Sequence, residues 1–278
     1  MIHLFALLSL LLCGVCYTGF QNSSHFRNTG SRRSLLLLVF GGALLLRLLL
    51  AYTTHGFSND IACFAAWADR IFTLGPGQFY SAEMFTDYPP GFMYVLYLIG
   101  ALRSLLQIPY YSDLHILLLK LPAILCDIAC GFLLYREAVK RLHFSDLQGI
   151  FAASAYLFQP AVILNSSCWG QVDSVYTLMI ILMCLFLMKG NLLPAYAVYG
   201  LGVLLKPQML IFTPVLLAGI WDHVFLQDFS WRKFFYNLCG GLVVICGMLL
   251  LCAPFGLTAA ISQYTSTLGS YEYAAINA

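Results

Sequence analysis

The sequence predicts an all-α protein, a polytopic transmembrane helical bundle, and its composition and patterning support that class. Of the 278 residues, 61% are hydrophobic and only 9% are charged, whereas soluble globular domains carry about 25% charged residues. Apolar runs recur along the chain at lengths close to the roughly 20 residues that a spanning helix needs. A surface that faces water on all sides cannot be built from so few charges, so a soluble domain is excluded. The net charge of +2 gives no indication of a nucleic-acid partner.

Eight apolar runs are predicted to cross the membrane. They cover residues 2–19, 35–53, 115–135, 149–164, 172–188, 192–205, 208–221 and 235–255. The run 2–19 has no Lys or Arg before it and no clear cleavage site after it. It is therefore predicted to be an uncleaved helix rather than a signal peptide.

Basic residues in short loops predict the orientation, because Lys and Arg favour the cytoplasmic side. Basic clusters lie before the run 35–53 and after the run 115–135. Both can be cytoplasmic only if the apolar stretch 89–106 starts and ends on one side, so this stretch is predicted to be re-entrant or interfacial. The turn 189–191 and the loop 222–233 are then also cytoplasmic, and the loop 54–88 lies outside.

Two acidic residues mark the predicted outer loop 54–88, and each has a structural alternative. Asp60 is either a functional carboxylate or the cap of a helix that starts at Ile61. Asp87 precedes Tyr88-Pro89-Pro90, where it fits either a binding residue or simple turn chemistry.

Two further polar motifs are predicted to reach the same face. Trp169-Gly170-Gln171 leads to Asp173 at the outer end of an apolar helix, where a carboxylate also favours the helix dipole. Lys206-Pro207-Gln208 separates two apolar runs. It is either a solvated helix break or the place of a Lys that needs water or a partner.

Two charged residues interrupt apolar runs. Asp127 lies near the middle of the run 115–135, where it is either functional or paired with a Lys or Arg for packing. Arg47 lies about two turns below the outer end of the run 35–53, where it either snorkels to the interface or binds a lipid phosphate.

Together these motifs resemble the GT-C superfamily of membrane glycosyltransferases, and the likeness runs from about Leu35 onward. It is strongest to bacterial mannosyltransferase-like proteins related to the GPI mannosyltransferase PIG-V. The resemblance implies one transmembrane domain over residues 1–278, with a GT-C-like seven-helix core at 35–257 and an extra N-terminal helix at 2–19. Site residues would lie in the outer loop 54–88, and residues 258–278 would begin a second outer loop, after which family members continue with more helices.

The resemblance also implies an inverting glycosyltransferase of glycan biosynthesis. It would transfer a hexose, mannose by expectation, from a polyprenyl-phosphate sugar donor to a glycan or glycolipid acceptor. Asp60 would be the catalytic base, and Arg47 and Lys206 would stabilise the leaving phosphate. The other candidate substrate-binding residues are Asp87, Tyr88, Trp169, Gln171, Asp173 and Gln208.

Three further expectations accompany that mechanism. Asp60, Asp87 and Asp173 are candidate ligands for a divalent cation, Mg²⁺ or Mn²⁺, which some relatives use. The protein is expected in a bacterial plasma membrane, with its site facing outward.

A polytopic transporter or lipid flippase explains Arg47, Asp127 and Lys206 equally well. The predicted clustering of carboxylates on one face favours the enzyme over that alternative. A catalytically inactive scaffold within a glycan-assembly complex is a third reading.

Overall fold

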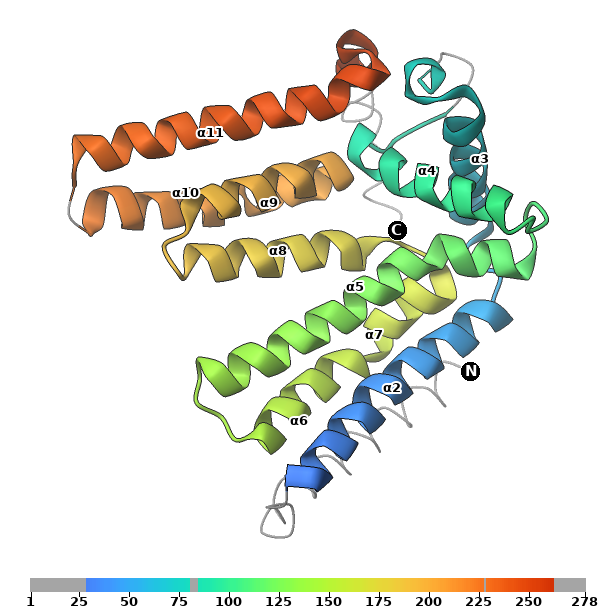
Figure 1. Cartoon of the computed structure of the whole chain (residues 1–278), viewed down its shortest axis with the longest axis horizontal. Coiled ribbons are helices and arrows are strands. Elements are labelled where there is room, and N and C mark those ends of the chain that lie inside the picture. The colour runs from blue at the N-terminus through green and yellow to red at the C-terminus, as the bar shows by residue number, and fades with distance from the viewer. Residues whose placement is uncertain (1–28, 81–84, 228, 263–278) are drawn as a thin grey trace, which may run out of the picture. The chain divides into compact units, whose positions relative to one another are not determined.

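The computed structural model describes residues 29–80, 85–227 and 229–262, and every regular element within these ranges is a helix (Figure 1). Four helices there are long and apolar enough to span a membrane, namely Arg32–Thr53, Asp113–Lys140, Pro207–Leu226 and Trp231–Phe255. A fifth span results if the bent pair Asp146–Leu157 and Pro160–Trp169 is counted as one. The prediction of an all-α, multi-pass membrane protein is confirmed.

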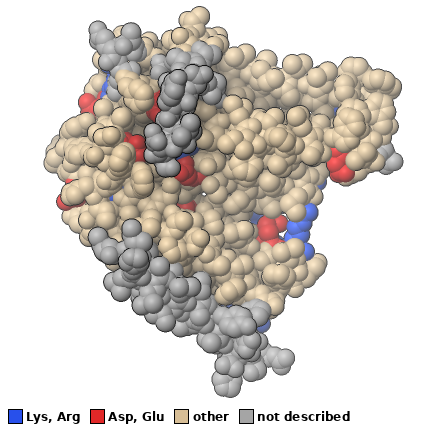
Figure 2. Space-filling view, turned by 180° about the vertical axis from the view of Figure 1, so that it is seen from behind, with Lys and Arg blue, Asp and Glu red and all other residues tan. Residues whose placement is uncertain are grey.

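The surface agrees with a lipid environment. Figure 2 shows a face on which most of the coloured area is uncharged, with Lys, Arg, Asp and Glu in a few separate places. Along the helix Trp231–Cys252, large apolar side chains are exposed, including Leu242 at 53% and Leu250 at 73%. Lipid tails would cover such side chains, because the bilayer core is as apolar as leucine.

The chain divides into two compact units. Unit 1 comprises residues 1–62 and 110–178, and unit 2 comprises residues 63–109 and 179–278. The helices α3 (Ser58–Leu74) and α8 (Asp173–Leu187) each pass from one unit into the other.

Unit 1 is built on α2 (Thr29–Thr53), α5 (Asp113–Lys140) and α6 (Asp146–Leu157), followed by α7 (Pro160–Ile163) and the π-helical turn η3 (Leu164–Trp169). Ser145 starts α6 through a capping box, in which its hydroxyl accepts from the Gln148 backbone N–H and the Gln148 side chain accepts from the Ser145 N–H. Gly131 lets α5 approach α6 closely, because a Cβ atom there would lie 2.6 Å from Leu157 Cγ.

Unit 2 contains two groups of helices. The first group comprises the rest of α3, η2 (Pro76–Gln78) and α4 (Pro90–Leu105). The second group begins with the rest of α8 and continues with α9 (Leu192–Leu205), η4 (Pro207–Phe212), α10 (Thr213–Trp221), η5 (Asp222–Leu226), α11 (Trp231–Cys252) and η6 (Ala253–Phe255). Helix α4 packs closely on α9, because a Cβ at Gly91 would lie 2.5 Å from the Leu204 carbonyl oxygen.

The predicted spans within the described ranges correspond to helices, but one span is bent and one predicted loop contains a helix. The run 149–164 is broken between Leu157 and Pro160, and the two pieces bend by 51°. Pro160 has no N–H to donate to the preceding turn, so the helix restarts there. The loop 54–88 contains the 17-residue helix α3, and the stretch 89–106 forms α4.

Other predictions remain untested. The orientation of the chain and the re-entrant placement of the stretch 89–106 stay predictions. The helix predicted at residues 2–19 lies outside the described ranges.

Candidate functional site

Asp60 lies at the beginning of α3, and the side chains of Trp169 and Gln171 bind its carboxylate. Its Oδ2 atom accepts from Trp169 Nε1 at 3.0 Å and from Gln171 Nε2 at 2.5 Å. Helix α3 begins at Ser58, so Asp60 lies inside its first turn and is not the cap of a helix that starts at Ile61. A carboxylate in a first helical turn also interacts favourably with the helix dipole.

The backbone around this carboxylate is tightly fitted. The Phe57 N–H donates to the Trp169 carbonyl at 2.9 Å, and the two rings pack with centroids 5.3 Å apart. Gly170 has φ of +90°, and a Cβ atom there would lie 2.6 Å from Ile61 Cδ1. Only glycine fits both the left-handed conformation and this close approach. The segment after η3 and the start of α3 therefore form one latch, made of Asp60, Trp169, Gly170 and Gln171.

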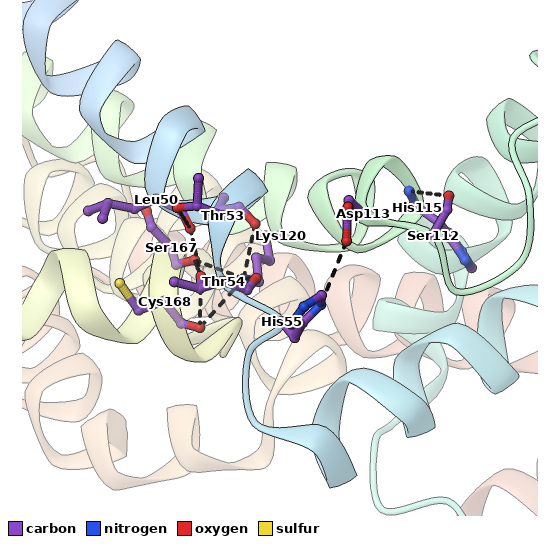
Figure 3. A network of polar contacts seen from close by, with 11 residues as sticks. Leu50, Thr53, Thr54, His55, Ser112, Asp113, His115, Lys120, Ser167 and Cys168 are labelled. Atoms are coloured by element: carbon purple, nitrogen blue, oxygen red, sulfur yellow. Dashed lines mark hydrogen bonds and ion pairs between the residues drawn. The ribbon is translucent and has the colours of Figure 1, made fainter.

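Lys120 on α5 is fully buried, and a Cβ atom at Gly170 of the latch would lie 3.3 Å from its Cε. Figure 3 shows Lys120 with its polar neighbours Thr54, Ser167 and Cys168. The Lys120 Nζ atom lies within hydrogen-bond distance of five oxygens: the Thr54 carbonyl at 2.7 Å, Ser167 carbonyl at 3.0 Å, Thr54 Oγ1 at 3.1 Å, Ala51 carbonyl at 3.3 Å and Cys168 carbonyl at 3.5 Å. These oxygens lie at the end of α2 and in the last part of η3. The ammonium group therefore joins α2, α5 and η3.

Arg47 and Asp127 form a second buried polar group in unit 1, and both are 0% exposed. Arg47 Nε donates to Asp127 Oδ2 at 3.0 Å, and its Nη2 and Nη1 donate to the carbonyls of Leu157 at 2.7 Å and Ala43 at 3.2 Å. Of the two alternatives for Asp127, pairing with a basic residue is the one that the structure shows. Arg47 does not snorkel, because all three of its nitrogens are engaged inside the unit.

Hydroxyl groups complete the shell of Asp127. Ser166 Oγ donates to Oδ2 at 2.6 Å, and Ser174 Oγ and the Tyr156 hydroxyl donate to Oδ1 at 2.5 and 3.4 Å. A buried charge needs such partners, because an uncompensated buried charge lowers the stability of a protein by several kcal/mol.

Asp173 lies in the first turn of α8, where Asn165 Nδ2 donates to its Oδ2 at 2.9 Å. Asn165 is the second residue of η3, so this bond joins the start of η3 to the start of α8 within unit 1.

The remaining predicted site residues belong to unit 2. Lys206 occupies the break between α9 and η4 with an extended backbone, and its Nζ lies 5.8 Å from the centroid of the Tyr88 ring. The Tyr80 hydroxyl donates to the Tyr88 carbonyl at 3.1 Å. Burial, and to a lesser extent nearby Cys252, raises the pKa of the Tyr80 phenol, so it stays a neutral donor. Asp87 is half-buried and Gln208 is exposed.

The predicted site residues thus fall into two groups. Unit 1 brings together Asp60, Trp169 and Gln171 in one bonded cluster, and it also holds Asp173 and Arg47. The group in unit 2 comprises Asp87, Tyr88, Lys206 and Gln208. Sequence reasoning missed Lys120, although a Lys seven residues before Asp127 in one apolar run was a usable signal.

Asp60 and Asp173 of unit 1 are arranged for hydrogen bonds, and the expected cation role of Asp87, in unit 2, stays a prediction. No group of three or more His, Cys, Asp or Glu able to hold a metal ion occurs among the residues that the structure describes. Asp60 and Asp173 accept from indole and amide donors, an arrangement that does not fit Mg²⁺ or Mn²⁺. No cation-dependent step follows from this geometry.

Comparison with known proteins identifies a different family from the one that the motifs suggested. A family described as GPI transamidase subunit PIG-U matches residues 35–273. A search of curated proteins finds no match.

This match corrects the predicted activity. The family is not that of the mannosyltransferase PIG-V, so the assignment to mannosyltransferase-like proteins is wrong. The predicted glycosyltransferase activity is also wrong, together with its polyprenyl-phosphate sugar donor and its glycan or glycolipid acceptor. The transporter or flippase alternative is wrong as well. The structure suggests why the motifs misled: Trp169 and Gln171 bind the Asp60 carboxylate, so residues typical of a sugar site here join two helix ends.

The predicted location is confirmed only in part. The chain is an integral, multi-pass membrane protein, but the match does not support a bacterial plasma membrane or an outward-facing site. Because the match extends over residues 35–273 of the 278, this chain belongs to the PIG-U family of GPI transamidase subunits.

Proposed function

We propose that this chain is a structural membrane subunit of a GPI transamidase, located in the membrane of the endoplasmic reticulum. A GPI anchor replaces the hydrophobic C-terminal tail of a protein, which is removed. The complex must therefore bind two membrane-embedded substrates while one peptide bond is exchanged. In this proposal the chain supplies helical scaffold, and another subunit supplies the chemistry.

The observation that carries this proposal is the internal bonding of the charged residues Asp60, Arg47, Asp127 and Lys120 in unit 1. The Asp60 carboxylate is bound by Trp169 and Gln171, Arg47 is bound to Asp127, and Lys120 is surrounded by backbone carbonyls. Groups committed to internal bonds fix helix positions, as buried polar networks do when every member is satisfied. A rigid helical unit of this kind suits a scaffold that holds partner subunits.

The latch gives the proposal a second support. Trp169 remains 50% exposed although its indole N–H is bound to Asp60. Aromatic side chains that are fixed in place and exposed are favoured contacts at protein interfaces. We propose that the latch positions the Trp169 ring for a neighbouring subunit.

A rescue experiment with two variants of Asp60 tests this role. Cells that lack the endogenous chain would receive the unmutated chain, Asp60→Asn or Asp60→Ala, and the surface level of a GPI-anchored reporter would be measured. We expect the unmutated chain and Asp60→Asn to restore the reporter, because an amide oxygen still accepts hydrogen bonds from Trp169 and Gln171. Asp60→Ala removes both bonds and should reduce the reporter severalfold.

The two variants separate a latch from a proton-transfer role. A base loses its function in Asp60→Asn, whereas a hydrogen-bond acceptor does not. If Asp60→Asn abolished the reporter at normal protein level, the latch assignment would be wrong. If the unmutated chain failed to restore the reporter although inserted in the membrane, the proposed function itself would be wrong.

A further inference from the structure

Unit 2 carries an apolar groove between α9, α10, η5 and α11. Its volume is about 400 Å³, and its walls include Leu216 and Ile220 on one side and Leu242 and Ile245 on the other. Ligand pockets in proteins commonly enclose about 300–1,000 Å³. The groove is therefore large enough for part of a lipid tail.

A second, larger pocket adjoins this groove. Its volume is about 870 Å³, and it is formed by the turn after α8, by His223, and by the first turns of α11. Asn237 lines both cavities, so the apolar groove and this pocket adjoin at Asn237. The Asn237 side chain is oriented there, because Nδ2 donates to the Lys233 carbonyl at 2.8 Å and Oδ1 accepts from the Tyr196 hydroxyl at 3.4 Å.

The second pocket is basic. Arg232, Lys233 and His223 line it, and among the residues that the structure describes no Asp or Glu belongs to its lining. Asp222 is adjacent in the chain to His223, and its carboxylate accepts from Gln227 Nε2 at 2.6 Å. The pocket therefore offers cationic and neutral donors, together with the hydroxyls of Ser230 and Tyr236.

Both segments of the basic pocket were predicted to be cytoplasmic from the sequence alone. The turn 189–191 and the loop 222–233 are distant in sequence, yet unit 2 brings them together around one cavity. The cytoplasmic leaflet carries anionic lipids, and basic pockets between transmembrane helices bind their headgroups. An apolar groove beside a pocket lined by Arg232 and Lys233 matches the acyl chain and the anionic headgroup of such a lipid.

We propose that unit 2 binds one anionic glycerophospholipid of the cytoplasmic leaflet. One acyl chain occupies the groove between α10 and α11, and the phosphate is bound by Arg232 and Lys233 beside His223. A transmembrane helix of a partner subunit would explain the groove but not the cationic pocket at its end. The lipid accounts for both features with one ligand.

Native mass spectrometry of the full chain tests this site with two probes, phosphatidylserine and phosphatidylcholine. The unmutated chain should retain phosphatidylserine in preference to phosphatidylcholine. In the double variant Arg232→Gln and Lys233→Gln, the preference for phosphatidylserine over phosphatidylcholine should fall at least about tenfold, because each basic residue contributes to the attraction of anionic lipids. The control double variant Arg33→Gln and Lys140→Gln removes the same charge from unit 1 and should leave the preference unchanged.

A glycine pair on α11 tests the groove independently of charge. Gly241 lines the groove and has open space at its Cβ position, so Gly241→Leu fills the groove without a backbone clash. Gly247 also has open space but does not line the groove, so Gly247→Leu is its matched control. We expect Gly241→Leu to lose the bound lipid and Gly247→Leu to keep it.

Two outcomes would overturn this proposal. One is equal retention of both lipids by the unmutated chain. The other is retention of phosphatidylserine by Gly241→Leu together with loss of a partner subunit from the complex, which would assign the groove to a protein helix. Neither outcome bears on the GPI-anchored reporter assay, so this inference and the proposed function can fail separately.

Discussion

The ends of two helices supply the hydrogen-bond partners of Lys120 in the interior of unit 1. Its oxygen partners come from the C-terminal end of α2 and from the last residues of η3. Helix C-termini carry partial negative charge and unpaired carbonyls, and a Lys side chain satisfies both. Within the described ranges, no carboxylate forms an ion pair with Lys120. The stabilisation of this charge therefore rests on backbone geometry.

Replacing Lys120 by Met tests that arrangement. Met has a similar length but no donor, so the carbonyls of Thr54 and Ser167 would stay buried without their partner. Each unsatisfied buried group costs roughly 1–3 kcal/mol, so we expect Lys120→Met to lower the thermal midpoint of the purified protein markedly. Thermal unfolding followed by size-exclusion chromatography measures the effect. An unchanged midpoint would contradict the assigned role of Lys120.

The pair of Arg47 and Asp127 is best tested by a double-mutant cycle. Arg47→Met leaves a buried carboxylate, and Asp127→Asn leaves a buried guanidinium, so each single change should cost about 3–5 kcal/mol of unfolding free energy. The double variant removes both charges and keeps an acceptor for Ser166 and Ser174. We expect it to be more stable than the sum of the two single losses predicts. Detergent-induced unfolding in mixed micelles gives the unfolding free energy of each variant. If the loss in the double variant equalled the sum of the two single losses, Arg47 and Asp127 would not be coupled.

At the scale of elements, the sequence predicted the helices well but missed two features of their shape. Hydropathy located the spans at 35–53, 115–135 and 235–255, because long apolar runs have one stable form in a bilayer. It merged α6 and α7 across Pro160, because hydropathy does not detect a missing N–H. It also placed α3 in a loop, since this helix is short and carries Asp69 and Arg70 among buried residues such as Trp67.

The junction of α3 with η3 gives a prediction at this scale. Gly170→Ala puts a Cβ atom 2.6 Å from Ile61 Cδ1 at φ of +90°, so it should destabilise the junction and lower the thermal midpoint. Gly42 is the matched control, because it lies exposed in α2 with open space at its Cβ position. Gly42→Ala should leave stability unchanged or raise it by about 0.5–1 kcal/mol. A stable Gly170→Ala variant would contradict the close fit of the latch.

At the scale of the whole molecule, composition was sufficient for the class of protein and insufficient for its activity. The low content of charge specified a multi-pass membrane protein. The candidate residues were real features, since Asp60, Trp169 and Gln171 do meet in the structure. Their chemistry could not be read from the sequence, because the same side chains serve a sugar site or a structural latch. Of the three readings of the sequence, the family match contradicts the glycosyltransferase and the transporter, and the inactive scaffold stays a prediction.

Membership of an assembled complex is the central claim, and co-purification tests it most directly. The tagged chain would be isolated from membranes in mild detergent and the associated proteins quantified by mass spectrometry, with the tagged Asp60→Ala variant beside it. We expect the other GPI transamidase subunits, including the one with the catalytic residues, to be recovered in fixed ratio with the unmutated chain and in reduced amount with Asp60→Ala. Recovery of an intact, membrane-inserted chain without those subunits would contradict it.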